Sequence, residues 1–319
     1  MLFELISAMK TAIAEVEKWP DRRVRILHHN DADGLSSAAV LTRAFERGDF
    51  RVSRVCLEKP YPEVLEKVFE VRDRLIVLTD FAGRIAPMIS DLNRGRNLVL
   101  ILDHHKAMPA TDEKVHLLDP ELFGLRGDRD ITASTTCYLF ARTLDESNRD
   151  LAWIATVGAV GDRFFVDGCL VGPNKETALE AEHQGQLEIE AGDDGERYSL
   201  LTSVGPVECA SFARNLDTLG GAGYHRGGPE TAVEVCLDGP TDESDHLLGE
   251  LRSVQEQVFI GEVERLRKHG WAETSHVQWI HVGDRFQPMG VKMIGAFLDA
   301  IRTSDLVDRG KYLAGFQTV

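Results

Sequence analysis

The chain of 319 residues lacks long apolar runs, and it has few aromatic residues and few cysteines. No apolar segment approaches the roughly 20 residues that a membrane-spanning helix needs, so the sequence predicts no membrane partner. The stretch 1–19 has no basic start, and charged residues interrupt it at helical spacing. We therefore interpret it as an amphipathic helix rather than a signal peptide, and the cytoplasm is the default expectation.

Cysteine is scarce, and the five copies contain no C-x-x-C pair. An odd, dispersed set indicates reduced thiols that are mostly buried. The pattern argues against both a disulfide framework and a cysteine-based zinc site. The five residues are Cys56, Cys137, Cys169, Cys209 and Cys236.

Positive charge is also in short supply, since 36 lysines and arginines face 52 acidic residues and give a formal net charge of −16. This balance argues against broad, non-specific binding to duplex nucleic acid, which depends on a basic surface. It does not exclude an enzyme that acts on nucleic acid, because a metal site inverts the local field. Aromatic residues make up 7% and form no evident stripe for stacking bases, so binding of long strands is not supported.

Strand and helix patterns alternate along the first half of the chain. Continuously apolar runs of this kind are typical of strands that are buried on both faces. Repeated strand–helix units imply right-handed crossovers and a parallel sheet, so the sequence predicts an α/β fold with helices on both faces of the sheet. The expected strands are 24–29, 50–57, 74–80 and 97–103, and the expected helices are 35–47, 62–71, 84–92, 131–144 and 149–162.

A strongly acidic segment suggests where the first domain ends. Residues 176–196 contain many acidic side chains and neither lysine nor arginine. We expect a first domain at residues 1–175, an acidic linker at 176–205 and a smaller α/β domain at 206–319, across a cleft from the first. The alternative, an acidic surface helix and loop of the first domain, stays open. The second region should contain a Gly-rich loop, a long helix at 241–270, a strand at 276–282, a helix at 291–301 and a last strand at 311–319.

Acidic residues and histidines gather where the predicted strands end. In a parallel sheet, ligands bind beyond the carboxyl ends of the strands, so residues that follow different strands meet at one edge. Three strands and the helix 149–162 each finish in such residues. They are His29, Asp31 and Asp33 after the first strand, Asp80 after the third, Asp103, His104 and His105 after the fourth, and Asp162 at the helix end.

This concentration of carboxylates predicts a metal centre, because they cannot all stay ionised at close range without cations. Mixed imidazole and carboxylate ligands suit manganese, iron or zinc better than calcium, and so many side chains favour two ions. Paired ions about 3.5–4 Å apart bind phosphate oxygens and lower the pKa of a bridging water so that it attacks as hydroxide. Taken alone, Asp80 could equally be a helix cap or turn residue.

Four motifs carry a resemblance to a known superfamily. "HNDADG", "TD", "DHH" and "GAVGD", in this order between residues 23 and 162, resemble the motifs of the DHH phosphoesterases. That superfamily includes RecJ single-strand exonucleases, nanoRNases, cyclic-dinucleotide phosphodiesterases and family II inorganic pyrophosphatases. The form "HxDADG", with His29 two residues before Asp31, is most similar to archaeal-type RecJ-like proteins.

The resemblance implies a role for each motif residue, with two divalent cations as cofactors: Mn²⁺, or alternatively Mg²⁺ or Co²⁺. Asp103 would support the ligand set, and His105 would reach the phosphate or protonate the leaving group. The resemblance implies that one ion is bound by His29 and Asp31. It implies that the other is bound by Asp33, His104 and Asp162, and that Asp80 bridges the two ions.

The second half of the chain resembles RecJ-like proteins more loosely. It is similar to part of the DHH-associated substrate-binding domain, and the Gly-Gly-Gly-His loop of that domain does not follow "KYLAGFQTV". "GAGYHRGG" stands where the family has an Asn-Ala-x-Gly-Arg motif, so Arg226 or His225 is expected to bind the substrate phosphate instead. The alternative is a flexible Gly-rich loop.

Together these features predict hydrolysis of phosphodiester bonds in single-stranded or short oligonucleotides. One alternative is an inorganic pyrophosphatase or other small-phosphate hydrolase, although the position of His29 departs from the pyrophosphatase form. Another is a non-catalytic RecJ-like replication or scaffold protein, but such relatives lose motif carboxylates that this chain keeps. DNA or RNA preference, cleavage direction, metal identity and oligomeric state stay open.

Overall fold

The computed structural model describes residues 1–203 and 205–318. The chain forms two compact units, one of residues 1–216 with 236–239 and the other of residues 217–235 with 240–319. Within the described ranges, none of the helices combines the length and the apolar character that a membrane crossing demands.

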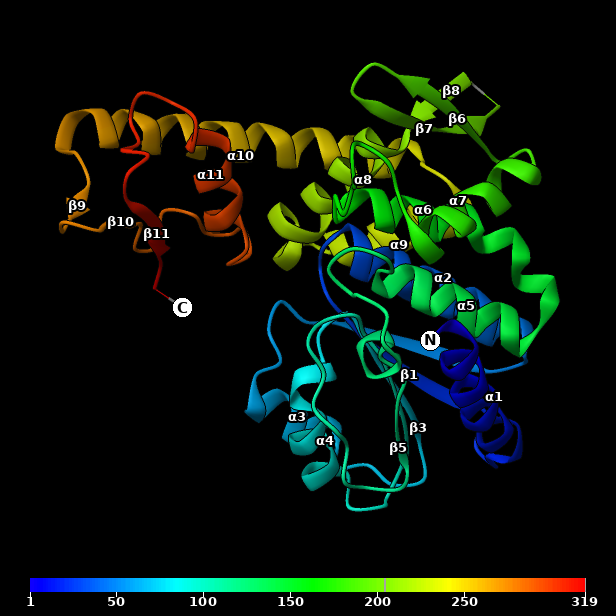
Figure 1. The fold of residues 1–319 in the computed structure, drawn as a ribbon. Helices are drawn as coiled ribbons and strands as arrows, with labels where there is room; N and C mark the ends of the chain where they lie inside the picture. The colour runs from blue at the N-terminus through cyan, green and yellow to red at the C-terminus, as the bar shows by residue number, and fades with distance from the viewer. Residues whose placement is uncertain (204, 319) are drawn as a thin grey trace. The chain divides into compact units, whose positions relative to one another are not determined.

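The first unit is built on a five-stranded sheet in which every strand pair is parallel, so the predicted α/β fold is confirmed (Figure 1). The strand order is β2-β1-β3-β4-β5. The fifth strand was not expected, because its three residues are too short to give a pattern in the sequence. The strands are β1 (Arg23–His28), β2 (Arg51–Cys56), β3 (Leu75–Thr79), β4 (Leu98–Leu102) and β5 (Val115–Leu117).

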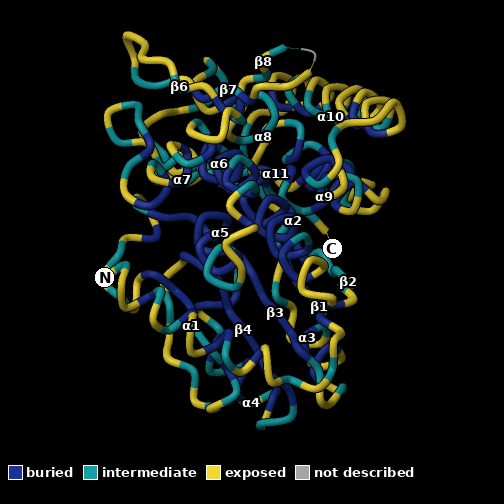
Figure 2. Tube along the Cα trace, turned by 90° about the vertical axis from the view of Figure 1, so that its right-hand side faces the viewer, coloured by how far each residue is buried: buried dark blue, intermediate teal, exposed yellow. Residues whose placement is uncertain are grey.

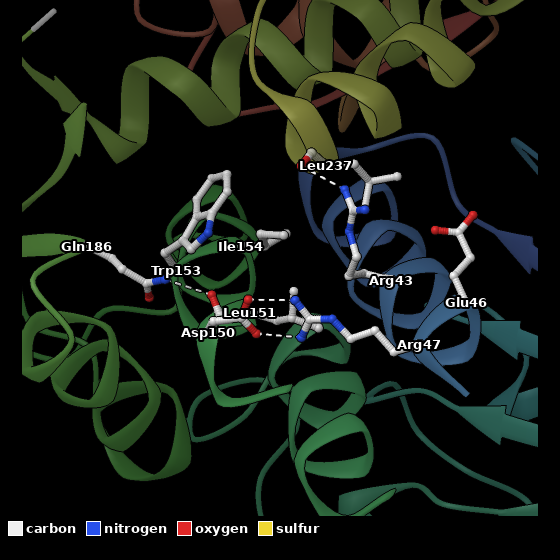
Figure 3. Close-up of a pocket in the computed structure, with 9 residues that line it drawn as sticks. All are labelled: Arg43, Glu46, Arg47, Asp150, Leu151, Trp153, Ile154, Gln186 and Leu237. Atoms are coloured by element: carbon white, nitrogen blue, oxygen red, sulfur yellow. Dashed lines mark hydrogen bonds and ion pairs between the residues drawn. The ribbon is translucent and has the colours of Figure 1, made fainter. Parts of the chain in front are cut away.

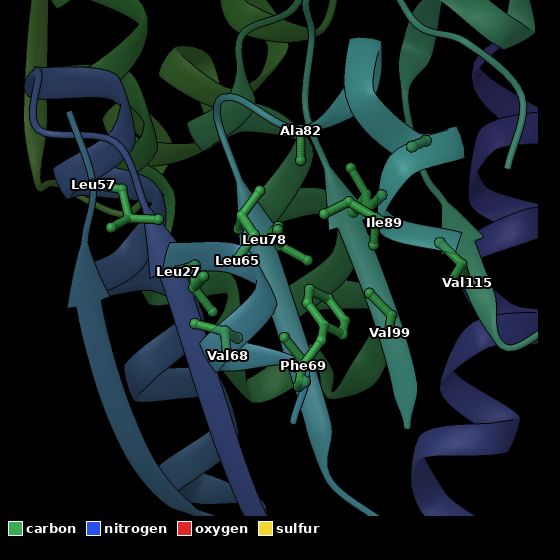
Figure 4. Packing of buried hydrophobic residues seen from close by; sticks show 13 residues of the cluster. Leu27, Leu57, Leu65, Val68, Phe69, Leu78, Ala82, Ile89, Val99 and Val115 are labelled. Carbon is green, nitrogen blue, oxygen red and sulfur yellow. The ribbon is translucent and has the colours of Figure 1, made fainter. Parts of the chain in front are cut away.

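Helices cover both faces of this sheet. On one face, Leu27, Leu78 and Val99 pack against α3 and α4 in a continuous apolar cluster (Figure 4). On the other face lie α2, α5 and α6, which pack against one another, with α1 against α5. Burial on both faces explains why β3 and β4 are buried at every position and apolar at every position except Thr79, and Figure 2 shows them at the buried centre of the unit. These helices are α1 (Leu2–Lys18), α2 (Ala32–Arg47), α3 (Pro62–Val68), α4 (Ala86–Asn93), α5 (Ala133–Leu144) and α6 (Ala152–Gly161).

Residues 176–205, expected as an acidic linker, are folded within the first unit wherever the structure describes them. In β6, acidic residues alternate with apolar ones, and Leu187, Tyr198 and Leu200 are buried while Glu188 and Glu190 are exposed. This alternation is the pattern of a half-buried antiparallel sheet. The elements are α7 (Gly172–His183), β6 (Leu187–Gly192), β7 (Gly195–Thr202), β8 (Gly205–Glu208) and α8 (Cys209–Asp217).

The second unit combines a long helix with a small sheet of order β11-β10-β9. Phe259 of the long helix packs with Phe286 and Phe297 to form its aromatic core. The strand expected at 311–319 ends at Phe316, and Val319 lies outside the described residues. The elements include a π-helical turn (Thr218–Ala222), a 3-10 turn (Tyr224–Arg226), α9 (Gly228–Asp238, whose residues 236–238 belong to the first unit), α10 (Asp242–His269), β9 (Ala272–Glu273), β10 (Val277–His281), α11 (Met293–Ile301) and β11 (Tyr312–Phe316).

Candidate metal centre

Three neighbouring strands deliver the predicted site residues to one edge of the sheet. His28 of β1 is in register with Thr79 of β3, and Thr79 with Leu102 of β4. The residues that follow, His29, Asp80 and Asp103, therefore leave the sheet side by side. The order β2-β1-β3 also makes this a topological switch point, which is where open α/β sheets bind ligands.

The turn from β1 into α2 positions two further carboxylates. Asp31 caps α2, and its Oδ1 accepts a hydrogen bond from the backbone N–H of Gly34 at 3.0 Å. A Cβ atom on Gly34 would lie 2.7 Å from the carbonyl oxygen of His29, so the turn requires glycine at this position. The tight turn keeps Asp31 and Asp33 next to the end of β1.

His29, Asp31 and Asp80 form the first ligand group. Nδ1 of His29 lies 2.7 Å from Oδ2 of Asp31 and 3.4 Å from Oδ2 of Asp80. Burial opposes charge on His29, but the carboxylate of Asp31 and then that of Asp80 outweigh it and raise its pKa to about 10. Nδ1 of His29 and Oδ2 of Asp80 are both buried, and neither makes a well-aligned hydrogen bond within the described residues although oppositely charged atoms lie close by. Since buried polar atoms rarely go unpaired, this pair fits a bound cation.

Asp33, His104 and Asp162 form the second group. Nε2 of His104 lies 3.4 Å from Oδ2 of Asp162 and 3.9 Å from Oδ2 of Asp33. Nδ1 of His104 is 2.6 Å from the carbonyl oxygen of Gly127 and donates to it, because a carbonyl oxygen can only accept. In its neutral form the ring therefore turns the lone pair of Nε2 toward the carboxylates, as a metal ligand must.

Asp80 takes part in both groups. Its Oδ2 faces His29, and its Oδ1 lies 3.3 Å from Nε2 of His104. Its backbone has a φ of 68°, in the left-handed region that few residues other than glycine adopt. Strained backbone of this kind clusters at functional sites, where the surrounding structure holds it in place. Asp80 therefore faces a histidine of each group with a different oxygen.

The amino terminus of α5 holds Asp33. The backbone N–H of Ala133 donates to its Oδ2 at 2.8 Å and that of Ser134 donates to its Oδ1 at 3.0 Å. Complete burial and then the charge of Asp80 raise the pKa of Asp33 to about 6 in spite of these donors. Sequence reasoning missed the two amides. The helix start is readable from Thr132, whose side chain caps α5, but the sequence does not show which carboxylate that helix end binds.

Asp103 lies behind the ligand groups and orients His105. Its Oδ1 accepts from Nδ1 of His105 at 2.8 Å, and its Oδ2 accepts from the backbone N–H of Gly83 at 2.6 Å. Burial opposes ionisation of Asp103, but His105 outweighs it and holds its pKa at about 2. The same hydrogen bond raises the pKa of His105, whose side chain is 56% exposed and so can meet a substrate.

Asp119 is a second site residue that sequence reasoning missed. It is fully buried, and its Oδ2 has no hydrogen-bond partner among the residues described. Burial and then the charge of Asp103 raise its pKa to about 7. The segment "LLDPELF" reads as a strand end followed by a turn, and nothing in it indicates that Asp119 lies behind the site.

The two residues predicted to bind phosphate belong to the second unit. His225 and Arg226 lie on the 3-10 turn Tyr224–Arg226. Arg226 pairs with Glu250 at 2.7 Å, and its side chain is partly exposed. Their part in substrate binding stays a prediction. In the first unit, by contrast, the structure brings together all six predicted ligands as well as Asp103 and His105.

Comparison with known proteins supports this interpretation of the fold and the motifs. Residues 23–161 match the model for the DHH family, N-terminal domain. The resemblance drawn from the motifs is thereby confirmed. The uncharacterized protein MJ0831 of Methanocaldococcus jannaschii is 32% identical over 169 residues, which cover 52% of this chain and 38% of MJ0831. The chain thus spans well under half the length of that relative.

Solved structures share the fold at low sequence identity. The exonuclease RecJ bound to manganese aligns with a TM-score of 0.66 and 19% identity, over 97% of this chain and 80% of its own. CDC45 from Entamoeba histolytica aligns with a TM-score of 0.67 and 11% identity, over 97% of this chain and 85% of its own. These likenesses show the fold, which is common to an exonuclease and to CDC45.

Proposed function

We propose that this protein is a metal-dependent phosphodiesterase that cleaves single-stranded or short oligonucleotides at a site for two divalent cations. The observation that carries the proposal is the position of Asp80, whose two oxygens face His29 and His104 in separate ligand groups. His29 and Asp31 would hold one cation, and the second group would hold the other. Manganese is the first candidate, because the RecJ structure of similar fold contains it.

Two cations in these groups would bind phosphate oxygens and lower the pKa of a water enough for it to attack phosphorus. The chain's own residues prepare the site for this chemistry. The amides of Ala133 and Ser134 fix the position of Asp33, and the carbonyl of Gly127 fixes the tautomer of His104. Ligands held in this way need little reorganisation when substrate binds.

His105 is the proposed general acid. Its Nδ1 is engaged by Asp103, so a proton on Nε2 is directed away from that carboxylate and toward the exposed side of the ring. Asp103 raises the pKa of His105 above its ordinary value, because its carboxylate accepts a hydrogen bond from the ring and favours the protonated form. A protonated imidazole there can donate its proton to the leaving alkoxide as the ester bond breaks.

Replacing the two adjacent histidines should give different results. His104→Ala should lower the metal content, because it removes a nitrogen that faces three carboxylates. His105→Ala should retain the metal and reduce kcat by about 10²–10⁴-fold, the usual contribution of an acid–base group. Elemental analysis and steady-state kinetics of both variants measure these effects. His183→Ala, which removes an exposed histidine from the end of α7, is the matched control. Equal loss of metal in both variants would refute the division of roles.

Substrate length is the second expectation within this proposal. A net charge of −16 offers few partners for the many phosphates of a long strand, and each such contact weakens as salt rises. A short substrate needs only the cations and one or two donors. We therefore expect higher kcat/KM for oligonucleotides of a few residues than for long strands, with an advantage that widens with salt.

The measurement compares a dinucleotide, a pentamer and a long single strand, as DNA and RNA, with Mn²⁺ at low and at physiological salt. Preference for the long strand at physiological salt would contradict the short-substrate expectation and favour an exonuclease of long strands. Turnover of pyrophosphate in place of every oligonucleotide would make the protein a small-phosphate hydrolase. Tight metal binding without any turnover would favour a non-catalytic role.

A further inference from the structure

A hollow of about 290 Å³ in the second unit has an unusual charge balance. It lies between the last turns of α10, the strands β9 and β10, and the loop that follows β10. Its lining includes Arg265, Arg285, His269 and His281, but Glu262 is the single carboxylate among the described residues that line it. In a chain with a net charge of −16, a cation-rich hollow needs an explanation.

Glu262 is shared between the two arginines. It is 3% exposed, and its two oxygens accept from Nε and Nη2 of Arg285 at 2.8 and 2.9 Å. Arg265 lies 3.8 Å from the same carboxylate, too far for a hydrogen bond. Glu262 and, at longer range, Asp284 offset the charge of Arg285, whereas Arg265, whose side chain is 50% exposed, makes no hydrogen bond to Glu262 and retains most of its hydrogen-bonding capacity.

Arg285 is held rigidly by this arrangement. Besides Glu262, it donates to the backbone carbonyl of His281 at 3.1 Å. The guanidinium plane is thus fixed at the wall of the hollow before any ligand arrives. A fixed arginine beside an exposed one with unused donors can bind phosphate well, because guanidinium groups match the geometry of phosphate oxygens.

A comparison within the first unit shows that arginines alone do not make such a site. The hollow of about 520 Å³ in Figure 3 is lined by Arg43 and Arg47. There, both oxygens of Asp150 bind Arg47 at 2.6 Å, and Asp238 binds Arg43 at 2.7 Å. Each guanidinium has its own carboxylate in that hollow, so no positive charge is left for an anion.

Trp279 supplies a second kind of recognition in the cation-rich hollow. It lies on β10 two residues before His281, so that both side chains leave the same face of the strand. An indole beside paired cations suits a ligand with a flat ring and a phosphate. At about 290 Å³ the hollow lies at the lower limit of ligand pockets, which indicates one nucleotide rather than a strand.

We propose that this hollow binds a single nucleotide, with Arg265 and Arg285 on the phosphate and Trp279 against the base. The nucleotide is either a free nucleoside monophosphate or the end residue of an oligonucleotide, and the chemistry of recognition is the same. The assignment to the end residue of an oligonucleotide rests on the proposed function. A protein that cleaves oligonucleotides would encounter both their end residues and free nucleotides. Binding itself needs no hydrolysis.

The test is equilibrium binding to the full-length chain in the presence of a chelator, so that the metal centre neither binds the probe through cations nor turns it over. The probes are adenosine 5′-monophosphate, adenosine, inorganic phosphate and a pentanucleotide. Arg265→Gln should weaken binding of the monophosphate about tenfold, the effect of losing one charge-assisted hydrogen bond. Trp279→Leu should weaken it by a similar factor, about tenfold, through lost stacking. Arg267→Gln, which changes an exposed arginine of α10 that does not line the hollow, should bind as the wild type does.

Equal weakening by Arg265→Gln and Arg267→Gln, or no binding at all, would overturn the proposal. Phosphate binding as tightly as the monophosphate would overturn the nucleotide assignment. A pentanucleotide that binds more tightly than the monophosphate, and loses affinity in Arg265→Gln, identifies the strand end as the ligand. The reverse order identifies the free nucleotide. Because hydrolysis plays no part in these measurements, their failure would leave the proposed phosphodiesterase activity untouched.

Discussion

Asp80→Asn should remove at least one of the two cations and nearly all hydrolysis. The variant loses the charge that faces both ligand groups, while asparagine tolerates the left-handed backbone of residue 80. Loss of one of two cations withdraws several kcal/mol of transition-state stabilisation, on the order of 10³-fold in kcat. The metal-free fold should be as stable as the wild type or more stable, because the charge of Asp80 disfavours ionisation of the buried Asp33.

Elemental analysis, kinetics and thermal unfolding of the metal-free protein test this prediction together. Asp73→Asn is the matched control, since Asp73 also has a left-handed backbone (φ 55°) but precedes β3 at the opposite end of the strand. The control should retain both metal and activity. Unchanged metal content with full activity in Asp80→Asn would show that Asp80 does not hold the cations.

The main features of the fold, and the meeting of the candidate ligands at one edge of the sheet, could be predicted from sequence because they follow from local patterns. Continuous apolar runs marked the buried parallel strands, and the residues directly after them had to meet at one edge. Asp80 shows that the role of one residue cannot be predicted from its own position in the sequence, since it could have been a simple turn residue. Only its register with His29 and Asp103 across neighbouring strands distinguishes it.

The parts that sequence did not reveal depend on contacts between distant segments. The amides of the α5 amino terminus bind Asp33 about a hundred positions away, and Gly127 accepts from His104 through its backbone, which carries no side-chain signal. The hairpin in the segment 187–200 was not predicted, for another reason. Its acidic residues dominated the composition and obscured a period of two, so that a half-buried hairpin was interpreted as a linker.

Added Mn²⁺ should stabilise the chelator-treated protein far more at pH 8 than at pH 5.5. Without cations, the pKa of Asp33 is raised to about 6 from an ordinary 3.8. The protonated form of Asp33 therefore makes its full contribution to the stability of the folded state below about pH 4, and this contribution is lost as pH rises through 6. The pKa of His29 is raised to about 10 from 6.5, so its contribution is lost only as pH rises through 10. Both groups hold protons that a cation must displace, and this competition weakens metal binding at low pH.

Thermal unfolding with and without a fixed concentration of Mn²⁺ measures the effect across this pH range. A cation present at 100 times its Kd adds about 2.7 kcal/mol, which raises Tm by about 5–10 °C for a unit of this size. That shift should appear at pH 8 and shrink toward pH 5.5. Asp73→Asn should behave as the wild type does, and Asp80→Asn should show little shift at either pH. A shift that is equal at both pH values, or that persists in Asp80→Asn, would mean that Mn²⁺ binds away from these carboxylates and imidazoles.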